Sequence, residues 1–274
     1  MANLYWKRVI EIQIIDGSDW IKFRSEVGDV TPFEIRFSVP FSDTPTPSQS
    51  EITLYNLNEK SIGIIKKGNF VRITAGYRGS SFGVITEGTI TEVRASLLEG
   101  VDRVTTFTIL EGKDYSEHKE VNISFGNGTD ANTILKRVSS TAGIPIAEIK
   151  LKNNKIYGSG YTADGQAMGV LEEVAEACET SVYYKRGQLM IKNFRDGNTE
   201  RLRLSPETGL INQPSKVEAD DYTGWSVQSL LQHKVSTGTA VTLDCKNVKG
   251  DFYVKSGTHT YDGSNFTTNC EVVL

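Results

Sequence analysis

Residues 50–112 carry the most regular pattern in the chain. SEITLYNLNE at 50–59 leads through KKGNFVRITAGY at 66–77 to GTITEV at 88–93 and DRVTTFTILEG at 102–112. Apolar and polar residues alternate in these runs, and that period is typical of half-buried β-strands. No grouping of residues typical of a catalytic site accompanies them. The stretch therefore predicts strand after strand around one short helix.

The helix is expected between the first two runs. Asn58 is suited to cap its N-terminus, Glu59 favours its first turn, and Gly68 ends it. Upstream, residues 10–14 and 33–39 also alternate between apolar and polar types, which predicts two more strands. We expect residues 1–118 to form an antiparallel, barrel-like domain.

Residues 119–195 have a different pattern. A helix is predicted from Asp130, capped by Thr129 and ended by Gly143, and a second helix over 166–179. A hairpin is predicted over 181–194, turning at Arg186-Gly187. These elements predict a small α/β domain.

Residues 196–274 return to strand patterns. The expected strands lie at 202–204, 227–231, 238–243, 252–255 and 266–273. The predicted class is therefore α+β but mainly β. It consists of two antiparallel β-barrel-like domains, 1–118 and 196–274, with the α/β domain at 119–195 between them.

The composition is that of a globular chain, with 38% hydrophobic and 23% charged residues. A net charge of −4 is too mild to indicate nucleic-acid or membrane binding. No run approaches the roughly 18 apolar residues of a membrane span, and residues 1–8 lack the apolar core of a signal peptide. The cysteines, Cys178, Cys245 and Cys270, are expected to be unbridged, with Cys178 buried in a helix.

The histidines give no sign of a metal site. His118, His233 and His259 are far apart in sequence, without metal-ligand spacing, so we expect them at the surface or in turns. Gly126–Thr129 precedes a helix and could hold an anion, but a simple turn is expected there.

Acidic and aromatic pairs also have simple explanations. Glu172 and Glu173 are neighbours on a helix and point in different directions, so they cannot flank a glycosidic bond. Asp220-Asp221 near Trp225 is expected to be an exposed acidic loop. Tyr183 and Tyr184 lie on opposite faces of a strand, so one of them is expected in the core. We therefore expect no catalytic, cofactor-binding or metal site.

The order of the motifs resembles that of hub proteins at the end of bacteriophage tails. Ile52–Leu57, then Lys67-Gly68, then Ala75–Tyr77 follow the pattern of the first barrel of such hubs. Thr133–Ile144 resembles their small α/β domain, and Thr208–Ile211 the start of their second barrel. The resemblance covers nearly the whole chain.

The resemblance implies a homotrimer whose two barrels per subunit form a pseudo-sixfold ring between the tail tube and the central spike. The lumen would pass the tape-measure protein and then DNA, the latter only as cargo. The same architecture occurs in the hub portion of type VI secretion spikes and in tail-like bacteriocins. The implied location is the virion, after assembly in the host cytoplasm, with no membrane partner. Because the chain ends at Leu274, soon after the second barrel, we expect no fused hydrolase.

Two other functions remain open. One is a cell-wall hydrolase of the tail tip that uses surface carboxylates. The other is a carbohydrate-binding β module centred on Tyr222 or Trp225. A further hypothesis concerns Pro40–Ser50, which contains three prolines and is expected to be a loop reaching a neighbouring subunit or the tube. An unattached surface loop is the alternative.

Overall fold

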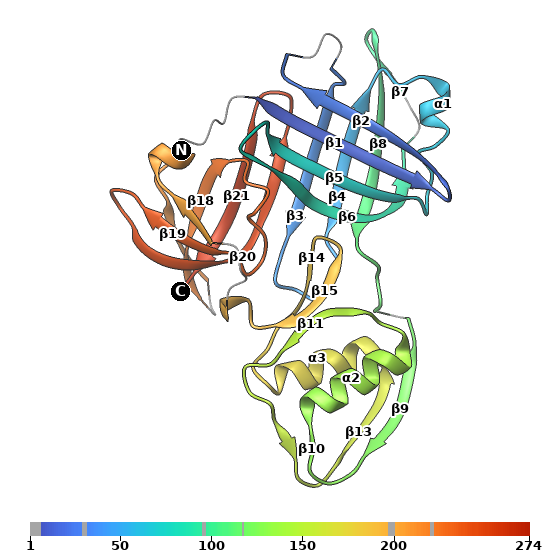
Figure 1. The fold of residues 1–274 in the computed structure, drawn as a ribbon, viewed down its shortest axis with the longest axis vertical. Helices are drawn as coiled ribbons and strands as arrows, with labels where there is room; N and C mark the ends of the chain where they lie inside the picture. The colour runs from blue at the N-terminus through green and yellow to red at the C-terminus, as the bar shows by residue number, and fades with distance from the viewer. Residues whose placement is uncertain (1–6, 29–31, 95–96, 117, 197–200, 220–221) are drawn as a thin grey trace.

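The computed structural model describes residues 7–28, 32–94, 97–116, 118–196, 201–219 and 222–274. Strands make up 54% and helices 13%, which confirms the mainly β class. Figure 1 shows two β-rich parts at one end of the molecule and a compact part with both longer helices at the other.

The first β section comprises β1 to β8. Its elements are β1 Arg8–Asp16, β2 Asp19–Glu26, β3 Ile35–Phe41, β4 Gln49–Tyr55, α1 Glu59–Ile62, β5 Phe70–Tyr77, β6 Ser81–Val93, β7 Leu97–Glu99 and β8 Asp102–Glu111. The predicted cap of α1 is confirmed, because the Asn58 side chain accepts a hydrogen bond from the Ser61 N–H at 2.8 Å.

The predicted loop at Pro40–Ser50 is shorter in the structure, since β3 continues to Phe41 and β4 begins at Gln49. Pro40 fits in β3 because its fixed φ suits an extended backbone and removes only one donor. Between the strands, Asp43 pairs with Lys255 of the same chain at 2.9 Å, and Pro47 is buried. The loop therefore lies against its own chain.

The α/β section comprises β9 to β15. Its elements are β9 Glu120–Phe125, β10 Thr129–Asp130, α2 Ala131–Ala142, β11 Ile146–Lys150, β12 Ile156–Tyr157, β13 Tyr161–Gln166, α3 Ala167–Glu176, β14 Val182–Lys185 and β15 Gln188–Lys192. The predicted hairpin is confirmed, and its turn has positive φ at both Arg186 and Gly187.

The predicted cap of α2 was placed one residue too early. Asp130, not Thr129, accepts the Thr133 N–H at 3.1 Å and the Thr133 hydroxyl at 2.7 Å. The Thr129 hydroxyl instead donates to the carbonyl of Gly126 at 2.8 Å, so Gly126–Thr129 is the turn that was expected. The predicted stop at Gly143 is confirmed by its φ of 69°.

The last β section comprises β16 to β21. Its elements are η1 Phe194–Asp196, β16 Arg201–Leu204, η2 Pro206–Thr208, β17 Ser215–Glu218, β18 Thr223–Leu230, β19 Ala240–Asp244, β20 Lys249–Tyr261 and β21 Phe266–Val273. β20 is much longer than the predicted strand at 252–255.

The two β sections form one sheet. The strand order is β17-β18-β21-β20-β3-β4-β8-β6-β5-β1-β2, with β16 and β19 joined beside β20 and β7 beside β8. β20 pairs with β3 from Gly257 opposite Phe41 to Tyr261 opposite Phe37, a pairing that we call the seam. Figure 1 shows β1 and β5 crossing over β3 and β4, so this half of the sheet folds back on itself. The expected pair of separate barrels is not confirmed.

The buried cores follow the same division. The first core crosses the seam, because Leu231, Tyr261 and Phe266 of the last section pack with residues of the first. The core of the last section likewise takes in Phe41 of β3. The core of the α/β section draws only on residues between Tyr115 and Ile191.

Candidate assembly interface

A row of polar side chains crosses six strands of the sheet at the seam. Successive cross-strand partners in this row are Thr267, Thr260, Ser38, Glu51, Thr108 and Glu92. Because side chains alternate along a strand, the intervening residues, such as Phe37 and Val39, face the core. We call the solvent side of these strands the polar sheet face.

Charges on the polar sheet face are paired locally. The Arg36 guanidinium donates to Glu34 at 3.2 Å and lies 4.9 Å from the centre of the Tyr55 ring. Arg94 pairs with Glu51 at 3.1 Å. Exposed pairs of this kind contribute little stability, so the face presents mainly neutral polar groups to a partner.

Two shallow depressions lie on the polar sheet face, at successive positions along the seam. One has a volume of about 280 Å³ and is lined by Ser38, Thr53 and Thr260 among others. The other, of about 410 Å³, is lined by Pro40, Thr258 and Asn269 among others. Among the residues that the structure describes, no group of acidic, histidine or cysteine side chains could hold a metal ion.

The three sections meet where β8 ends. The Glu111 carboxylate is buried and accepts the Gly187 N–H of the β14–β15 turn at 3.2 Å. Burial raises the pKa of Glu111 to about 7, although hydrogen bonds from Gly187 and Arg186 and the Arg186 charge lower it. The Arg186 guanidinium in turn donates to the carbonyl of His233 in the last section at 2.8 Å. We call this meeting point the joint.

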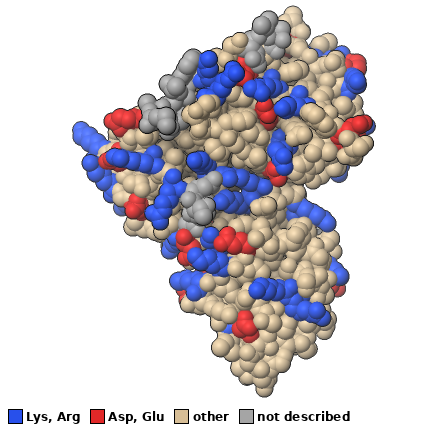
Figure 2. Space-filling model, viewed as in Figure 1, with Lys and Arg blue, Asp and Glu red and all other residues tan. Residues whose placement is uncertain are grey.

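The joint is tight because it is built from glycines. The Gly112 N–H donates to the Glu87 carbonyl at 2.9 Å. Gly187 has a φ of +84°, and a Cβ there would lie 2.8 Å from the same carbonyl oxygen. On the face shown in Figure 2, Lys and Arg side chains gather around the waist between the sections, although the net charge is negative.

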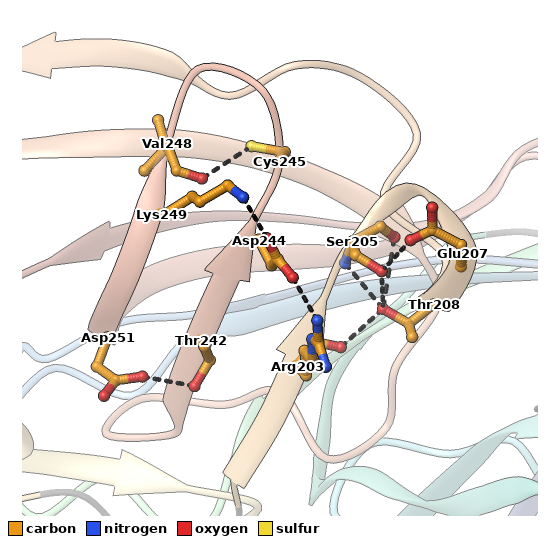
Figure 3. A network of polar contacts seen from close by, with 10 residues as sticks. All are labelled: Arg203, Ser205, Glu207, Thr208, Thr242, Asp244, Cys245, Val248, Lys249 and Asp251. Atoms are coloured by element: carbon orange, nitrogen blue, oxygen red, sulfur yellow. Dashed lines mark hydrogen bonds and ion pairs between the residues drawn. The ribbon is translucent and has the colours of Figure 1, made fainter.

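A second polar network covers the strands β16, β19 and β20 (Figure 3). Asp244 accepts from Arg203 and pairs with Lys249 at 3.4 Å, while Thr242 donates to Asp251 at 2.5 Å. The opposite side of these strands carries core residues such as Leu204. Charged side chains along an outer strand discourage pairing with a foreign strand, so this edge is protected.

The prediction for the histidines is wrong for His259. Its side chain is only 1% exposed; Nδ1 lies 2.8 Å from the Thr268 hydroxyl and Nε2 3.1 Å from the Val235 carbonyl. Since a carbonyl only accepts, Nε2 carries the proton of a neutral ring. Desolvation by burial lowers the pKa of His259 to about 3. Spacing in sequence argues against metal ligands but does not report burial.

The other two histidines lie nearer the surface. His118 is exposed, as expected. His233 is half-buried, with Nδ1 2.9 Å from the Ser81 hydroxyl of the first section. A Cβ on Gly83 would lie 2.3 Å from its ring, so His233 packs directly on the first section.

The prediction that one of Tyr183 and Tyr184 is core is corrected, because both are 3% exposed. The hairpin is covered on both sides: Tyr184 packs in the α/β core, and Tyr183 packs with Phe194 and Val273. Tyr222, which the sequence indicated as a candidate for glycan binding, donates a hydrogen bond to Glu271 at 2.5 Å.

The acidic and cysteine predictions have mixed outcomes. Glu172 is half-buried, which raises its pKa, whereas Glu173 is exposed, so the two do not share a site. Asp220 and Asp221 lie outside the described residues. Trp225 packs partly against the last core. Cys178, Cys245 and Cys270 are confirmed as free and buried.

Sequence reasoning missed the polar row and the joint. The alternating threonines at 106 and 108 indicated a solvated strand face, but not that it continues across the seam. Within the described residues, none of the helices is long and apolar enough to cross a membrane.

Solved structures of phage tail proteins share this fold. A tail protein from Neisseria meningitidis MC58 superposes with a TM-score of 0.66 at 8% identity, over 97% of this chain and 96% of that one. The 43 kDa tail protein of prophage MuSo2 from Shewanella oneidensis gives 0.60 at 10% identity, over 96% and 98%. The E. coli c3393 protein, a component of a type VI secretion system, gives 0.62 at 9% identity, over 90% and 75%. This chain therefore shares its fold with solved tail proteins and with a type VI secretion component.

The family model described as baseplate hub gp41 matches residues 49–258. This match spans most of the chain, so the chain belongs to the baseplate hub gp41 family. No curated protein sequence matches the chain. The resemblance seen in the sequence is confirmed.

Proposed function

We propose that this chain is a ring subunit of a tail baseplate hub that joins the tail tube to the central spike. The ring is a homotrimer, and its lumen passes the tape-measure protein and then DNA. The main observation that supports this proposal is the seam. It joins the two β sections into one continuous sheet, and such a sheet can serve as a wall of the ring.

Partners and location follow from the family. The E. coli protein with this fold resembles T4 tail proteins gp27 and gp5, and another match is a Francisella PdpA–VgrG complex. Tube, spike and tape-measure proteins are therefore the proposed partners. The proposed location is the virion tail after assembly in the host cytoplasm. The proposed domains remain 1–118, 119–195 and 196–274, with the two β-rich ones as barrel-like halves.

The proposed role is structural. Glu111 is the buried carboxylate with the most strongly raised pKa, and its hydrogen bonds tie two sections of the chain together. Zymography on purified cell wall is expected to show no clearing. Clearing that is abolished by a single Asp or Glu substitution would establish a hydrolase instead. Glycan binding that depends on Tyr222 or Trp225 would establish a carbohydrate module.

Light scattering tests the assembly directly. The purified chain, alone or mixed with its tail tube protein, is expected to give a mass of three copies and a complex with the tube. A monomer under both conditions, at concentrations where tube rings form, would overturn the proposal.

A further inference from the structure

The β7–β8 ribbon carries exposed apolar side chains that no described residue of its own chain covers. Leu97 is 62% exposed, Leu98 74% and Val101 95%. Among the described strands, β7 pairs only with β8. Neighbouring residues of a strand point to opposite faces, so Leu97 and Leu98 lie on different sides of the ribbon. Leu98 and Val101 are therefore the exposed apolar side chains of the tip, and exposed apolar groups of this kind mark interaction sites.

A complementary depression lies elsewhere on the chain. It has a volume of about 350 Å³ and is lined by Val27, Tyr77, Ile211, Leu230 and Phe266, with Arg8 at its rim. Val27 and Ile211 are themselves 47% and 44% exposed. Ser264, Asn265 and Thr267 also line it, so the depression is a partly apolar recess where the start of β1, the end of β5 and the start of β21 come together.

The ribbon cannot fill this recess in its own chain. Figure 1 places β7 and β21 on opposite sides of the upper part of the molecule. The ribbon is convex and the recess concave, so the two surfaces are complementary and neither matches itself. A patch that fits a recess elsewhere on the same molecule gives a head-to-tail contact between copies.

Charge also fits this arrangement. Asp102 lies at the tip of the ribbon, next to Val101, and accepts a hydrogen bond from the Asn56 amide; it forms no ion pair with a cation of the described residues. Arg8 at the recess rim donates to the Ser264 carbonyl and lies over the Tyr261 ring. Arg8 forms no ion pair with a carboxylate of the described residues. The acidic group at the ribbon tip would therefore approach a basic rim.

We propose that the β7–β8 ribbon of one copy inserts Leu98 and Val101 into the recess beside Ile211 of a second copy. This contact rests on the proposed function, since a ring of copies is what it would close. Each copy gives one ribbon and receives one, so the number of contacts equals the number of copies.

Cysteine cross-linking tests the contact. Val101→Cys and Ile211→Cys are made as separate variants and mixed, and a short bifunctional maleimide is added. The three native cysteines are buried. A covalent dimer is expected only in the mixture. The matched control mixes Val101→Cys with Ile156→Cys. Ile156 lies in the α/β section and is 67% exposed, so it is more accessible than Ile211 at 44%. This control mixture is expected to give no dimer.

A charge variant gives an independent measurement. Leu98→Asp is expected to weaken self-association at least about tenfold, whereas Ile156→Asp leaves it unchanged. If the wild-type ring forms but the cross-link is absent and Leu98→Asp assembles normally, the contact is wrong and the proposed function stands. If Leu98→Asp impairs only tube binding, the ribbon docks on the tube and the contact is again wrong. If the wild-type chain stays monomeric in the presence of tube protein and the cysteine variants give no cross-link, both the contact and the proposed function are wrong.

Discussion

The last β section and the α/β section are attached to the first in different ways. At the seam, five residue pairs of β20 and β3 are in register, and Phe266 packs its ring 5.4 Å from that of Tyr77. At the joint, the α/β section is held by a few polar contacts around Glu111 and Gly187 and by a small apolar cluster, in which Tyr183 and Met190 pack with Phe194 and Val273 of the last section. The main core of the α/β section, among the described residues, lies between Tyr115 and Ile191.

The difference teaches which parts should fold together. A large shared core makes the stability of two sections inseparable, whereas a joint with one small apolar cluster and a few polar contacts lets a section open by itself. We therefore expect the two β sections to unfold as one unit and the α/β section as another. For a hub, this would combine a rigid wall with an independently folded side domain.

The largest effect is expected from Phe266→Ala. Its ring lies between Phe37 and Tyr77 of the first section and Tyr261 of the last. Removing it should cost about 3–5 kcal/mol of unfolding free energy and destabilise both β sections together. Thermal unfolding followed by limited proteolysis measures this loss.

The matched control is Leu135→Ala, in the α/β core and fully buried. It should cost about 2–5 kcal/mol, confined to the α/β section. Phe266→Ala with an unchanged first section would mean that the two β sections are independent.

The seam should weaken in acid. Because the folded-state pKa of His259 is about 3, below the ordinary histidine value of 6.5, the unfolded chain binds a proton that the folded chain excludes. Stability from this group is complete above about pH 6.5 and falls as pH drops, by on the order of 4 kcal/mol at pH 3. His259→Gln should flatten this part of the pH profile. His118→Gln, at an exposed position, should leave the profile as in the wild type.

The joint, in contrast, should weaken as the pH rises. The folded chain keeps a proton on Glu111 up to about pH 7, whereas the unfolded chain releases it near 4.5. Stability therefore falls as pH rises between these values and levels off above pH 7, a change on the order of 3 kcal/mol. Glu111→Gln keeps the acceptor for Gly187 and should remove this slope. A slope that persists in the variant would assign it to another group.

The smallest effect is expected at the glycines. Gly187→Ala and Gly143→Ala both place a side chain at positive φ, which costs about 1–2 kcal/mol. Only Gly187→Ala also forces a methyl against the Glu87 carbonyl, since nothing lies within 4 Å at Gly143. Gly187→Ala should therefore cost more, measured by denaturant unfolding. Equal losses of unfolding free energy in the two variants would show that the structure around Gly187 shifts to accommodate the methyl group.

Local features were predictable from the sequence. The strand at 70–77, the cap at Asn58 and the turn at Arg186-Gly187 each depend on neighbours a few residues away, and all three are confirmed. The β9–β13 pair was not predicted, because the β13 sequence YTADGQ has little β-propensity and is supported by α3.

Long-range features were not predictable. The seam joins strands more than 200 residues apart, and β20 carries Lys255, Ser256 and Gly257 where a strand signal would need apolar residues. The burial of His259 depends on Val235 and Thr268, which reach it only in the fold. The family resemblance was therefore the only guide to how the sections combine.

Native-state hydrogen exchange tests the single β unit most directly. Under conditions where exchange reports opening free energies, amides of β3 at the seam should open with the same free energy as those of β20 and β21. Amides of α2 should open separately, and their opening free energy should change in the Glu111→Gln variant. Contradiction would come from β3 amides that open together with α2, or independently of β20, since the seam would then not join the two β sections into one wall.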